Sequence, residues 1–490
     1  MENSIKYRLR NASNNKSLIH KTHNILKPIF KLCNECNKKR KHWDESHQCC
    51  HLCYKAKTVL ISSGNEAVDD FIRYTRINWD ATDATFKMEF VPYNRFNDIE
   101  FIAEGGFSKV YKATWIDGPI ASWNYKKQAY RRKGKMMVAL KELNNSKNIT
   151  PEELNELKIF YDFAIRHQNS SIMYEYTDSY YDFNHYHDIS NHYGITKNPI
   201  TQNFVIVTDY YEGNNLTREI AKHFSLLLWY QKLLILESTI YKLEMVHNVN
   251  IIHRDYHSGN ILISNDFSST LCDLGISKSA MGHDEEIYGI IPYIAPEILK
   301  RQNYTIASDI YGFGMIMWEL MTGRRPFWDH DHDTDLIIKI CDGFRPPIVT
   351  NAPEGYVELM QRCWHSDPNK RPTATELRKK IVIMKNNEPE YYCDGITKIV
   401  KSPDIGPVKS INPGAIYKSR SLSEMIKSAE STRSLESIDS EISNNKFEDN
   451  LTINDNDYLT KEIELDIDND TSFGDSKDDD YVTEEINFDI

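Results

Sequence analysis

The sequence predicts an α+β fold, and three observations favour this class. Hydrophobic residues make up 40% of the 490 positions and aromatic residues 11%, which is enough for a sizeable core. Short apolar runs typical of strands occur at 138–140, 204–207 and 261–263. Helix signals occur at 151–160 and 226–234. Both strands and helices are therefore expected to contribute to one core.

The stretch 151–160 illustrates the helix prediction. Pro151 suits the first turn of a helix, acidic residues follow it, and Leu154 and Leu157 have the spacing of one helix face. The Leu-rich stretch 226–234 is too short to cross a membrane and is expected to be a buried helix. No signal peptide is expected in the basic segment 1–30, so we predict an intracellular, cytoplasmic chain with reduced cysteines and no membrane partner.

The most specific pattern runs from His253 to Asn260. His-Arg precedes Asp255, and Asn260 follows it by five positions. Phosphoryl transfer needs an acceptor for the proton of the attacking hydroxyl and a ligand for the magnesium that offsets phosphate charge. An aspartate and an asparagine are the right residue types for these two roles, so Asp255 and Asn260 are candidate catalytic residues.

Other chemistry-bearing residues stand in a fixed order around this pattern. Lys141 ends the apolar run at 138–140, and Asp273 stands in Leu271-Cys272-Asp273-Leu274-Gly275. A lysine can hold phosphates, and Asp273 can ligate magnesium. Glu156 is our choice for the partner of Lys141. Glu152 and Glu153 remain alternatives whose role is to complement the helix dipole.

In this order, with Ala295-Pro296-Glu297 closing the series, the motifs resemble those of eukaryotic protein kinases. The resemblance covers residues 96–385. It implies two lobes, an antiparallel β N-lobe with one major helix and a mainly helical C-lobe, with ATP and Mg²⁺ (or Mn²⁺) between them. It also implies that Asp309 holds the catalytic loop and that Arg371 pairs with Glu297. Cys363-Trp364 resembles the form seen in tyrosine kinases and in the tyrosine-kinase-like group.

The resemblance also implies a nucleotide pocket. Its predicted lining is Ile102, Ala103, Glu104, Gly105, Gly106, Phe107, Ser108, Val110, Ala139, Lys141, Thr208, Asp209 and Tyr211. The family pattern places glycine at 103, 105 and 108, and only Gly105 is kept here. Alanine and serine are small, so we expect ATP binding to persist. One alternative is a stiffened loop that binds nucleotide poorly. Another is a nucleotide-binding pseudokinase scaffold that recruits partners through a cysteine-rich N-terminal module and the C-terminal tail.

Two departures concern the acceptor residue. His257 stands where serine/threonine kinases carry lysine, and Ile290 stands where they carry threonine. The tyrosine-kinase signatures are also absent. We expect a protein kinase acting on protein substrates in signalling, with serine and threonine favoured over tyrosine and dual specificity open. His257 is expected to substitute for the lysine by staying charged beside the γ-phosphate.

Four cysteines form a second candidate site. Cys33, Cys36, Cys50 and Cys53 give the spacing CxxC–x13–CxxC, which suits a tetrahedral zinc ion in a knuckle at 31–56. Cys49, His47 and His51 are spare candidate ligands. The alternative is a set of unpaired thiols. No nucleic-acid partner is expected, although basic residues lie between the cysteine pairs.

The remaining segments are expected to have little fold of their own. Residues 1–30 should be disordered, 57–95 a helical linker, and 386–490 a disordered tail that is first Ser-rich and then acidic. The tail repeats a ten-residue frame at 458–467 and 481–490, which suggests strand addition to a partner. A second hypothesis is that the acidic end restrains the kinase by binding the basic loop 126–133. The layout is similar to an expanded fungal kinase family with a cysteine-bearing N-terminus and an acidic Asp-Ile tail.

Overall fold

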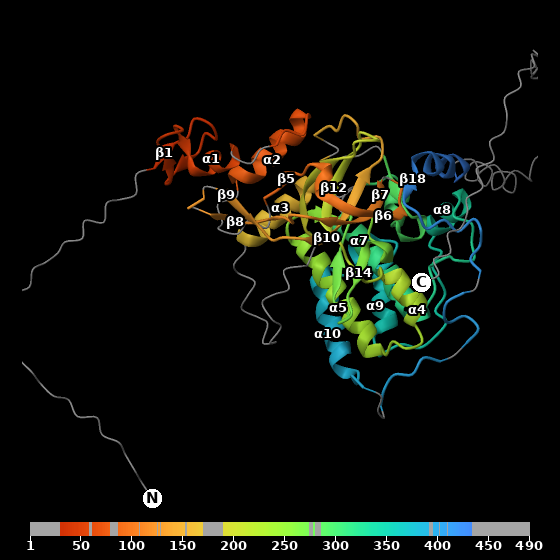
Figure 1. The fold of residues 1–490 in the computed structure, drawn as a ribbon. Helices are drawn as coiled ribbons and strands as arrows, with labels where there is room; N and C mark the ends of the chain where they lie inside the picture. The colour runs from red at the N-terminus through yellow and green to blue at the C-terminus, as the bar shows by residue number, and fades with distance from the viewer. Residues whose placement is uncertain are drawn as a thin grey trace, which may run out of the picture. The chain divides into compact units, whose positions relative to one another are not determined.

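A six-stranded sheet organises the first part of the chain (Figure 1). The computed structural model describes residues 30–57, 61–78, 87–106, 108–124, 126–127, 129–151, 154–169, 190–273, 278–279, 286–391, 395–400, 402–408 and 410–433. The strand order is β5-β11-β12-β10-β7-β6, and only β5 and β11 run parallel. These strands are β5 (Glu89–Phe90), β6 (Phe96–Glu104), β7 (Ser108–Trp115), β10 (Met136–Leu143), β11 (His192–Lys197) and β12 (Phe204–Asp209).

Strand β10 shows why this sheet orients the candidate site. Successive side chains of a strand point to opposite faces. Val138 and Leu140 are buried in a cluster with Trp115 and Val207 of the neighbouring strands, whereas Lys141 belongs to the alternate set. Burying the apolar face therefore places the lysine on the other face of the sheet.

Two helices pack together beside this sheet, α2 (Glu66–Asn78) and α3 (Asn155–Asn169). Phe71 and Ile72 of α2 lie in the same buried cluster as Phe160 and Tyr161 of α3. The hydroxyl of Tyr161 also donates to the backbone oxygen of Thr75 at 3.1 Å. The predicted linker 57–95 therefore contains a helix that shares the core of the kinase-like region.

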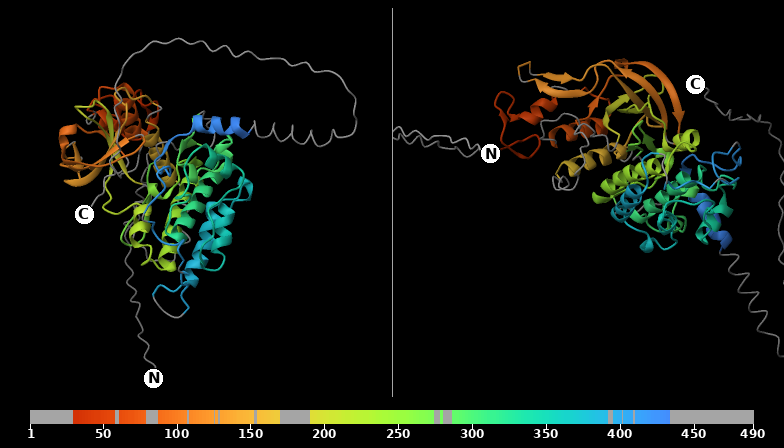
Figure 2. Two further views of the ribbon diagram at one scale, coloured as in Figure 1. Left: turned by 90° about the vertical axis from the view of Figure 1, so that its right-hand side faces the viewer. Right: turned by 90° about the horizontal axis from the view of Figure 1, so that it is seen from below.

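Smaller elements complete the amino-terminal part. The cysteine-bearing segment contains β1 (Lys31–Leu32), β2 (Lys39–Arg40), β3 (Trp43–Asp44), β4 (Cys49–Cys50) and α1 (His51–Lys57). The basic segment 126–133 belongs to a hairpin of β8 (Ile120–Asn124) and β9 (Ala129–Arg132). Figure 2 shows this hairpin in orange, next to the red N-terminal elements.

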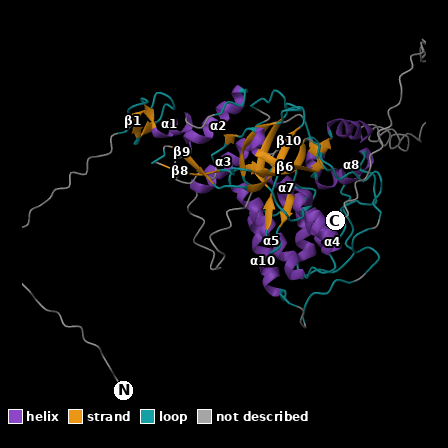
Figure 3. Ribbon diagram, viewed as in Figure 1, coloured by secondary structure: helices purple, strands orange, loops and turns teal. Residues whose placement is uncertain are grey.

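The second part of the chain is mainly helical (Figure 3). Its helices are α4 (Leu216–His223), α5 (Trp229–Asn248), α6 (Pro296–Leu299), α7 (Ile306–Thr322), α8 (Thr334–Cys341), α9 (Tyr356–Cys363) and α10 (Ala374–Asn387). Short strands run between them: β13 (Ile251–Ile252), β14 (Ile261–Ile263), β15 (Ser269–Leu271), β16 (Lys278–Ser279), β17 (Tyr288–Gly289) and β18 (Arg420–Ser421). The expected sheet-rich and helix-rich lobes are therefore confirmed. Among the described residues, no helix is both long and apolar enough to span a bilayer.

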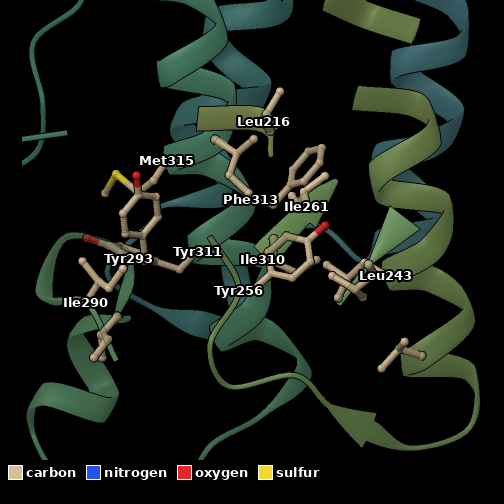
Figure 4. Packing of buried hydrophobic residues seen from close by; sticks show 14 of the residues in the cluster. Leu216, Leu243, Tyr256, Ile261, Ile290, Tyr293, Ile310, Tyr311, Phe313 and Met315 are labelled. Carbon is tan, nitrogen blue, oxygen red and sulfur yellow. The ribbon is translucent and has the colours of Figure 1, made fainter. Parts of the chain in front are cut away.

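The core of the helical lobe supports the segment that carries Asp255. Tyr256 is directed into this core, near Leu243 of α5 and Ile310 of α7 (Figure 4). Gly312 of α7 lies so close that an added Cβ would be 2.4 Å from the backbone oxygen of Tyr256. A glycine therefore lets the helix axis approach the loop more closely than any other residue would allow.

The segment 411–433 corrects the prediction of a tail disordered from residue 386 onward. Residues 423–433 form a helix, and Leu422, Ile426 and Ala429 are buried in the core of the helical lobe. Figure 1 shows this helix in blue beside α8. The three apolar residues have the i, i+4, i+7 spacing of one helix face, so the segment buries a stripe that a composition argument overlooks. The acidic part and both repeats lie outside the described residues.

Candidate active site

Asp309 of α7 fixes the loop that carries Asp255. Its carboxylate accepts hydrogen bonds from the backbone nitrogens of His253 and Arg254, at 2.8 and 2.9 Å. His247 of α5 contacts the same carboxylate at 2.8 Å. Asp309 is only 2% exposed, so these charge-assisted bonds form in a dry environment. The predicted anchoring role of Asp309 is what this geometry provides.

Asp255 is buried and ionised. Its Oδ1 lies 3.5 Å from Nε2 of His257, and its Oδ2 accepts a hydrogen bond from Oγ of Ser419 at 2.7 Å. Burial alone would raise the pKa of the carboxyl, but the charge and hydrogen bond of His257, together with the bond from Ser419, outweigh it and lower the pKa to about 2. The carboxylate is therefore ready to accept a hydroxyl proton at neutral pH.

The ring of His257 is oriented by its own backbone. Its Nδ1 accepts a hydrogen bond from the backbone nitrogen of Gly259 at 3.1 Å. In the neutral tautomer the hydrogen must then lie on Nε2, the atom that faces Asp255. His257 thus stands beside the catalytic carboxylate, and its predicted charge beside the γ-phosphate stays a prediction.

Asn260 holds the other side of the loop. Its Nδ2 donates to the backbone oxygen of Asp255 at 2.9 Å and lies 3.4 Å from Oδ2 of the same residue. Because the amide nitrogen is committed to Asp255, the side-chain oxygen is the atom left to bind a cation. An amide oxygen is a suitable ligand for Mg²⁺, so the donor set fits the predicted role.

Lys141 and Asp273 meet across the two lobes. Nζ of Lys141 donates to Oδ1 of Asp273 at 2.8 Å. Asp273 has a φ of 60°, a left-handed conformation that is costly for a residue with a side chain and concentrates at functional sites. Glu156 lies in the first turn of α3, but its side chain is outside the described residues, so its pairing with Lys141 stays a prediction.

The Gly-rich segment links β6 to β7. The backbone nitrogen of Gly105 donates to the backbone oxygen of Ser108 at 2.8 Å, which closes a tight turn. Ala103 pairs with Val110, and Val110 in turn lies opposite Lys141 of β10. Ile102 and Glu104 belong to β6, and Phe107 is outside the described residues. The predicted Gly-rich segment therefore leads into β7, the strand that pairs with β10 and lies opposite Lys141.

Two residues of the predicted nucleotide pocket, Thr208 and Asp209, lie at the end of β12. Thr208 is the Cα partner of Ala139 in β10. Ala139 lies two positions before Lys141, and Thr208 lies two positions after Ile206, the partner of Lys141. The side chain of Asp209 accepts hydrogen bonds from Asn191, at 2.8 Å, and from Tyr211, at 3.4 Å. The carboxylate of Asp209 therefore holds the end of β12 in place. The backbone of Asp209 is then the part of this residue that is suited to contact a nucleotide.

This arrangement agrees with the match to known families. The family model for protein tyrosine and serine/threonine kinases matches residues 96–381, more than half of the chain. The chain belongs to this protein kinase family. The anchored Asp255 and Asn260, and the Lys141–Asp273 pair, all fall within the matched kinase domain.

Similar proteins come from distant organisms. A serine/threonine-protein kinase/receptor of Acanthamoeba polyphaga mimivirus is 30% identical over 186 residues, 37% of this chain and 11% of that protein. A serine/threonine-protein kinase of Dictyostelium discoideum is 28% identical over 298 residues, 58% of this chain and 19% of that protein. The kinase roco5 of the same organism is 32% identical over 202 residues, 38% of this chain and 7% of roco5. The matched part is thus less than a fifth of each relative.

Glu297 and Arg371 form a buried ion pair within the kinase domain. Two parallel bonds of 2.6 Å join the guanidinium to the carboxylate. The side chain of Arg371 is fully buried and that of Glu297 is 5% exposed. Arg371 also donates to the backbone oxygens of His365 and Ala307. The pairing predicted from the resemblance is confirmed.

Glu319 of α7 is a site residue that was not predicted from the sequence. Its two oxygens accept hydrogen bonds from Ser258 at 2.9 Å and from Tyr293 at 2.8 Å. Burial raises the pKa of Glu319 to about 7, although both hydroxyl bonds act to lower it. Glu319 therefore connects the catalytic loop to the segment that ends at Glu297. The only signal in the sequence is an acidic residue within an apolar helix.

Ser419 is the second residue that sequence reasoning missed. Its hydroxyl donates a hydrogen bond to the carboxylate of Asp255, although the two residues are 164 positions apart. The backbone of Ser419 also approaches the Gly-rich segment, because a Cβ added to Gly106 would lie 2.3 Å from its carbonyl oxygen. The Ser-rich composition around it hid this position.

The four predicted zinc ligands come together in the amino-terminal segment. The sulfur atoms of Cys33, Cys36, Cys50 and Cys53 all lie within 4.8 Å of one another. The Sγ atoms of Cys33 and Cys53 are 3.8 Å apart, and those of Cys36 and Cys50 are 3.9 Å apart. These are too long for disulfides. The spare candidates Cys49, His47 and His51 are not part of this group.

Proposed function

We propose that this chain is an ATP-dependent protein kinase that phosphorylates serine and threonine hydroxyls of proteins. The observation that supports this best is the catalytic loop. Asp309 holds its backbone, Asn260 braces the carbonyl of Asp255, and the carboxylate of Asp255 is ionised. A pseudokinase scaffold is less favoured, because Lys141, Asp255 and Asp273 are all kept.

In this mechanism Asp255 orients the attacking hydroxyl and accepts its proton. Lys141 neutralises charge on the α- and β-phosphates, and Glu156 orients Lys141. Asn260 and Asp273 would hold Mg²⁺, which offsets charge on the phosphates when bound. His257, with Nε2 facing Asp255, provides a hydrogen-bond donor near the position of the transferred group.

Preference for serine and threonine rests on two indications. Relatives from Dictyostelium discoideum carry serine/threonine-protein kinase in their names. The tyrosine-kinase signatures are absent after Asp255, although His257 and Ile290 also depart from the serine/threonine pattern. Phosphoamino-acid analysis of a mixed protein substrate tests this. Phosphoserine and phosphothreonine are expected from wild type and not from Lys141→Met, while phosphotyrosine alone would refute the preference.

We also propose that the cysteine group binds a structural zinc ion. A tetrahedral ion with bonds of about 2.3 Å to sulfur requires sulfur atoms about 3.8 Å apart. The Cys33–Cys53 and Cys36–Cys50 distances of 3.8 and 3.9 Å fit this requirement. Four thiolates from two short loops leave no open position, so the ion would stabilise the fold without taking part in catalysis.

Several finer assignments are proposals of the same kind. Cys363-Trp364 supports a place in the tyrosine-kinase-like group, and the general layout supports kinship with the expanded fungal family. A partner that binds the repeats at 458–467 and 481–490 rests on their duplication alone.

A further inference from the structure

The segment 411–433 passes through the active site as an extended chain before it enters its helix. Ser419 lies where its hydroxyl donates to Oδ2 of Asp255 at 2.7 Å. Gly106 of the Gly-rich segment lies against the carbonyl of the same serine. On the side of the activation segment (residues 273–297), a Cβ added to Gly289 would be 3.6 Å from Oδ1 of Asp255. Ser419 is therefore held at the position from which a hydroxyl would attack.

The backbone after Ser419 pairs with the activation segment as an antiparallel strand. Arg420 lies opposite Gly289, and Ser421 lies opposite Tyr288. The backbone nitrogen of Leu422 continues the ladder by donating to the oxygen of Ile287 at 2.8 Å. Main-chain pairing of this kind is a common way to bind an extended peptide.

Side chains on both sides of Ser419 anchor the segment. Before it, the hydroxyl of Tyr417 donates to the oxygen of Pro326 at 2.9 Å, and the ring of Tyr417 packs against His332 at 4.8 Å. After it, Leu422 and Ile426 are each fully buried in the kinase core. Anchors that flank one serine define its register, because a slip by one residue would expose both apolar side chains.

We propose that Ser419 is a phosphorylation site of this kinase, modified in cis, and that segment 411–433 occupies the protein-substrate groove until that happens. This inference rests on the proposed kinase function. It assigns an internal substrate to the active site and defines the residues that a bound substrate contacts on either side of the acceptor.

The reaction is an ordinary phosphoryl transfer within one chain. Oγ of Ser419 forms a bond to the γ-phosphorus of ATP, while the bond from that phosphorus to the β,γ-bridging oxygen breaks. ADP leaves with the electron pair of the broken bond. The hydroxyl proton passes to Asp255 and then to water, so atoms and charges balance without any further reactant.

Phosphorylation would also end the occupancy of the groove. A phosphoserine carries about −1.5 to −2 charges and would stand beside the ionised carboxylate of Asp255. Repulsion between these groups disfavours the bound segment, whereas the unmodified hydroxyl stabilises it through the 2.7 Å bond. Release would then open the groove to other proteins.

The test uses the full chain, first treated with phosphatase and then mixed with Mg-ATP and a generic protein substrate. Mass spectrometry follows phosphate on Ser419. Because an intramolecular acceptor has a fixed effective concentration, the rate constant should stay unchanged over a roughly hundredfold range of enzyme concentration. Ser419→Ala should lose this phosphate and remain poorly active on the added protein. Ser421→Ala, at an exposed position two residues further along, is the matched control and should behave as wild type.

A second variant tests occupancy without relying on Ser419 chemistry. Leu422→Asp with Ile426→Asp removes two buried anchors, which should shift the segment toward release by roughly a hundredfold or more. Phosphorylation of the added protein should rise by about tenfold or more, limited by the fraction that was blocked. Hydrogen exchange at the amide of Leu422 should accelerate in parallel. Lys427→Asp with Ser428→Asp changes exposed positions of the same helix and should leave both readouts unchanged.

The outcomes separate this inference from the proposed function. Phosphate on the added protein without phosphate on Ser419 overturns the inference and leaves the kinase function standing. A Ser419 rate constant that rises in proportion to enzyme concentration overturns modification in cis. Phosphate on neither protein overturns both, and rapid exchange at Leu422 in wild type overturns the occupancy of the groove.

Discussion

Breaking the buried pair of Glu297 and Arg371 should destabilise the kinase domain severely. The change is Glu297→Gln, which removes a charge and keeps the size of the side chain. Arg371 is then left as an uncompensated cation, with a fully buried side chain. Removing one partner of a buried ion pair costs about 3–5 kcal/mol. Arg371→Leu should reach the upper end of that range, because the backbone oxygens of His365 and Ala307 also lose a donor.

The assay is urea unfolding of the full chain, followed by tryptophan fluorescence. The matched control is Asp335→Asn in the pair Asp335–Lys339, whose side chains are 65% and 49% exposed. An exposed pair of this kind contributes about 0–1 kcal/mol. The double variant Glu297→Gln with Arg371→Leu should cost less than the sum of the single changes, since the second removes the charge that the first left unpaired.

A small effect would refute this reasoning. If Glu297→Gln costs no more than Asp335→Asn, burial of the Glu297–Arg371 pair does not determine its contribution. Strict additivity of the two single changes would show that the two groups do not interact in solution.

Three further predictions address other parts of the molecule. Burial raises the pKa of Glu319 from 4.5 to about 7, so the protonated carboxyl stabilises the folded protein fully below pH 4.5. This stabilisation, about 3 kcal/mol, is lost as the pH rises through 7. Glu319→Gln should flatten the profile of melting temperature against pH, and an unchanged slope would contradict this prediction. Metal analysis should find one zinc ion per chain in wild type and in Cys49→Ser but none in Cys36→Ser; equal zinc in both variants would reject the proposed ligand set. Gly312→Ala would place a Cβ 2.4 Å from the backbone oxygen of Tyr256. It should slow turnover and lower the free energy of unfolding by about 1–3 kcal/mol, despite the better helix propensity of alanine. A net gain of stability would show that the close approach is unimportant.

The catalytic residues could be predicted because each of them lies in a short motif of neighbouring residues. Asp255 and Asn260 are five positions apart, and the side chain of Asn260 donates to the backbone oxygen of Asp255 within the same loop. Lys141 could be predicted because it ends the apolar run at 138–140, and the alternating burial along β10 then places it on the face opposite to Val138 and Leu140. The cysteine group follows from spacing alone, since two CxxC loops can meet only in a few ways.

The unpredicted parts depend on contacts between distant positions. Ser419 and Asp255 are brought together by a segment whose serine-rich composition resembles disorder, and the apolar spacing of Leu422 and Ile426 was its only signal. Glu319 looks like an isolated acid until the fold places Ser258 and Tyr293 against it. Composition measures an average, whereas burial depends on a few well-spaced side chains.

The most direct test of the central claim compares wild type with Asp255→Asn. Transfer of phosphate from Mg-ATP to an added protein is measured beside nucleotide binding, with both proteins at the same concentration. Asp255→Asn should lose roughly 10²–10⁴-fold in rate and still bind ATP, because its carboxylate acts on the hydroxyl and not on the nucleotide. Equal rates for the two proteins, or nucleotide binding without transfer in wild type, would contradict the proposal that this chain is an active protein kinase.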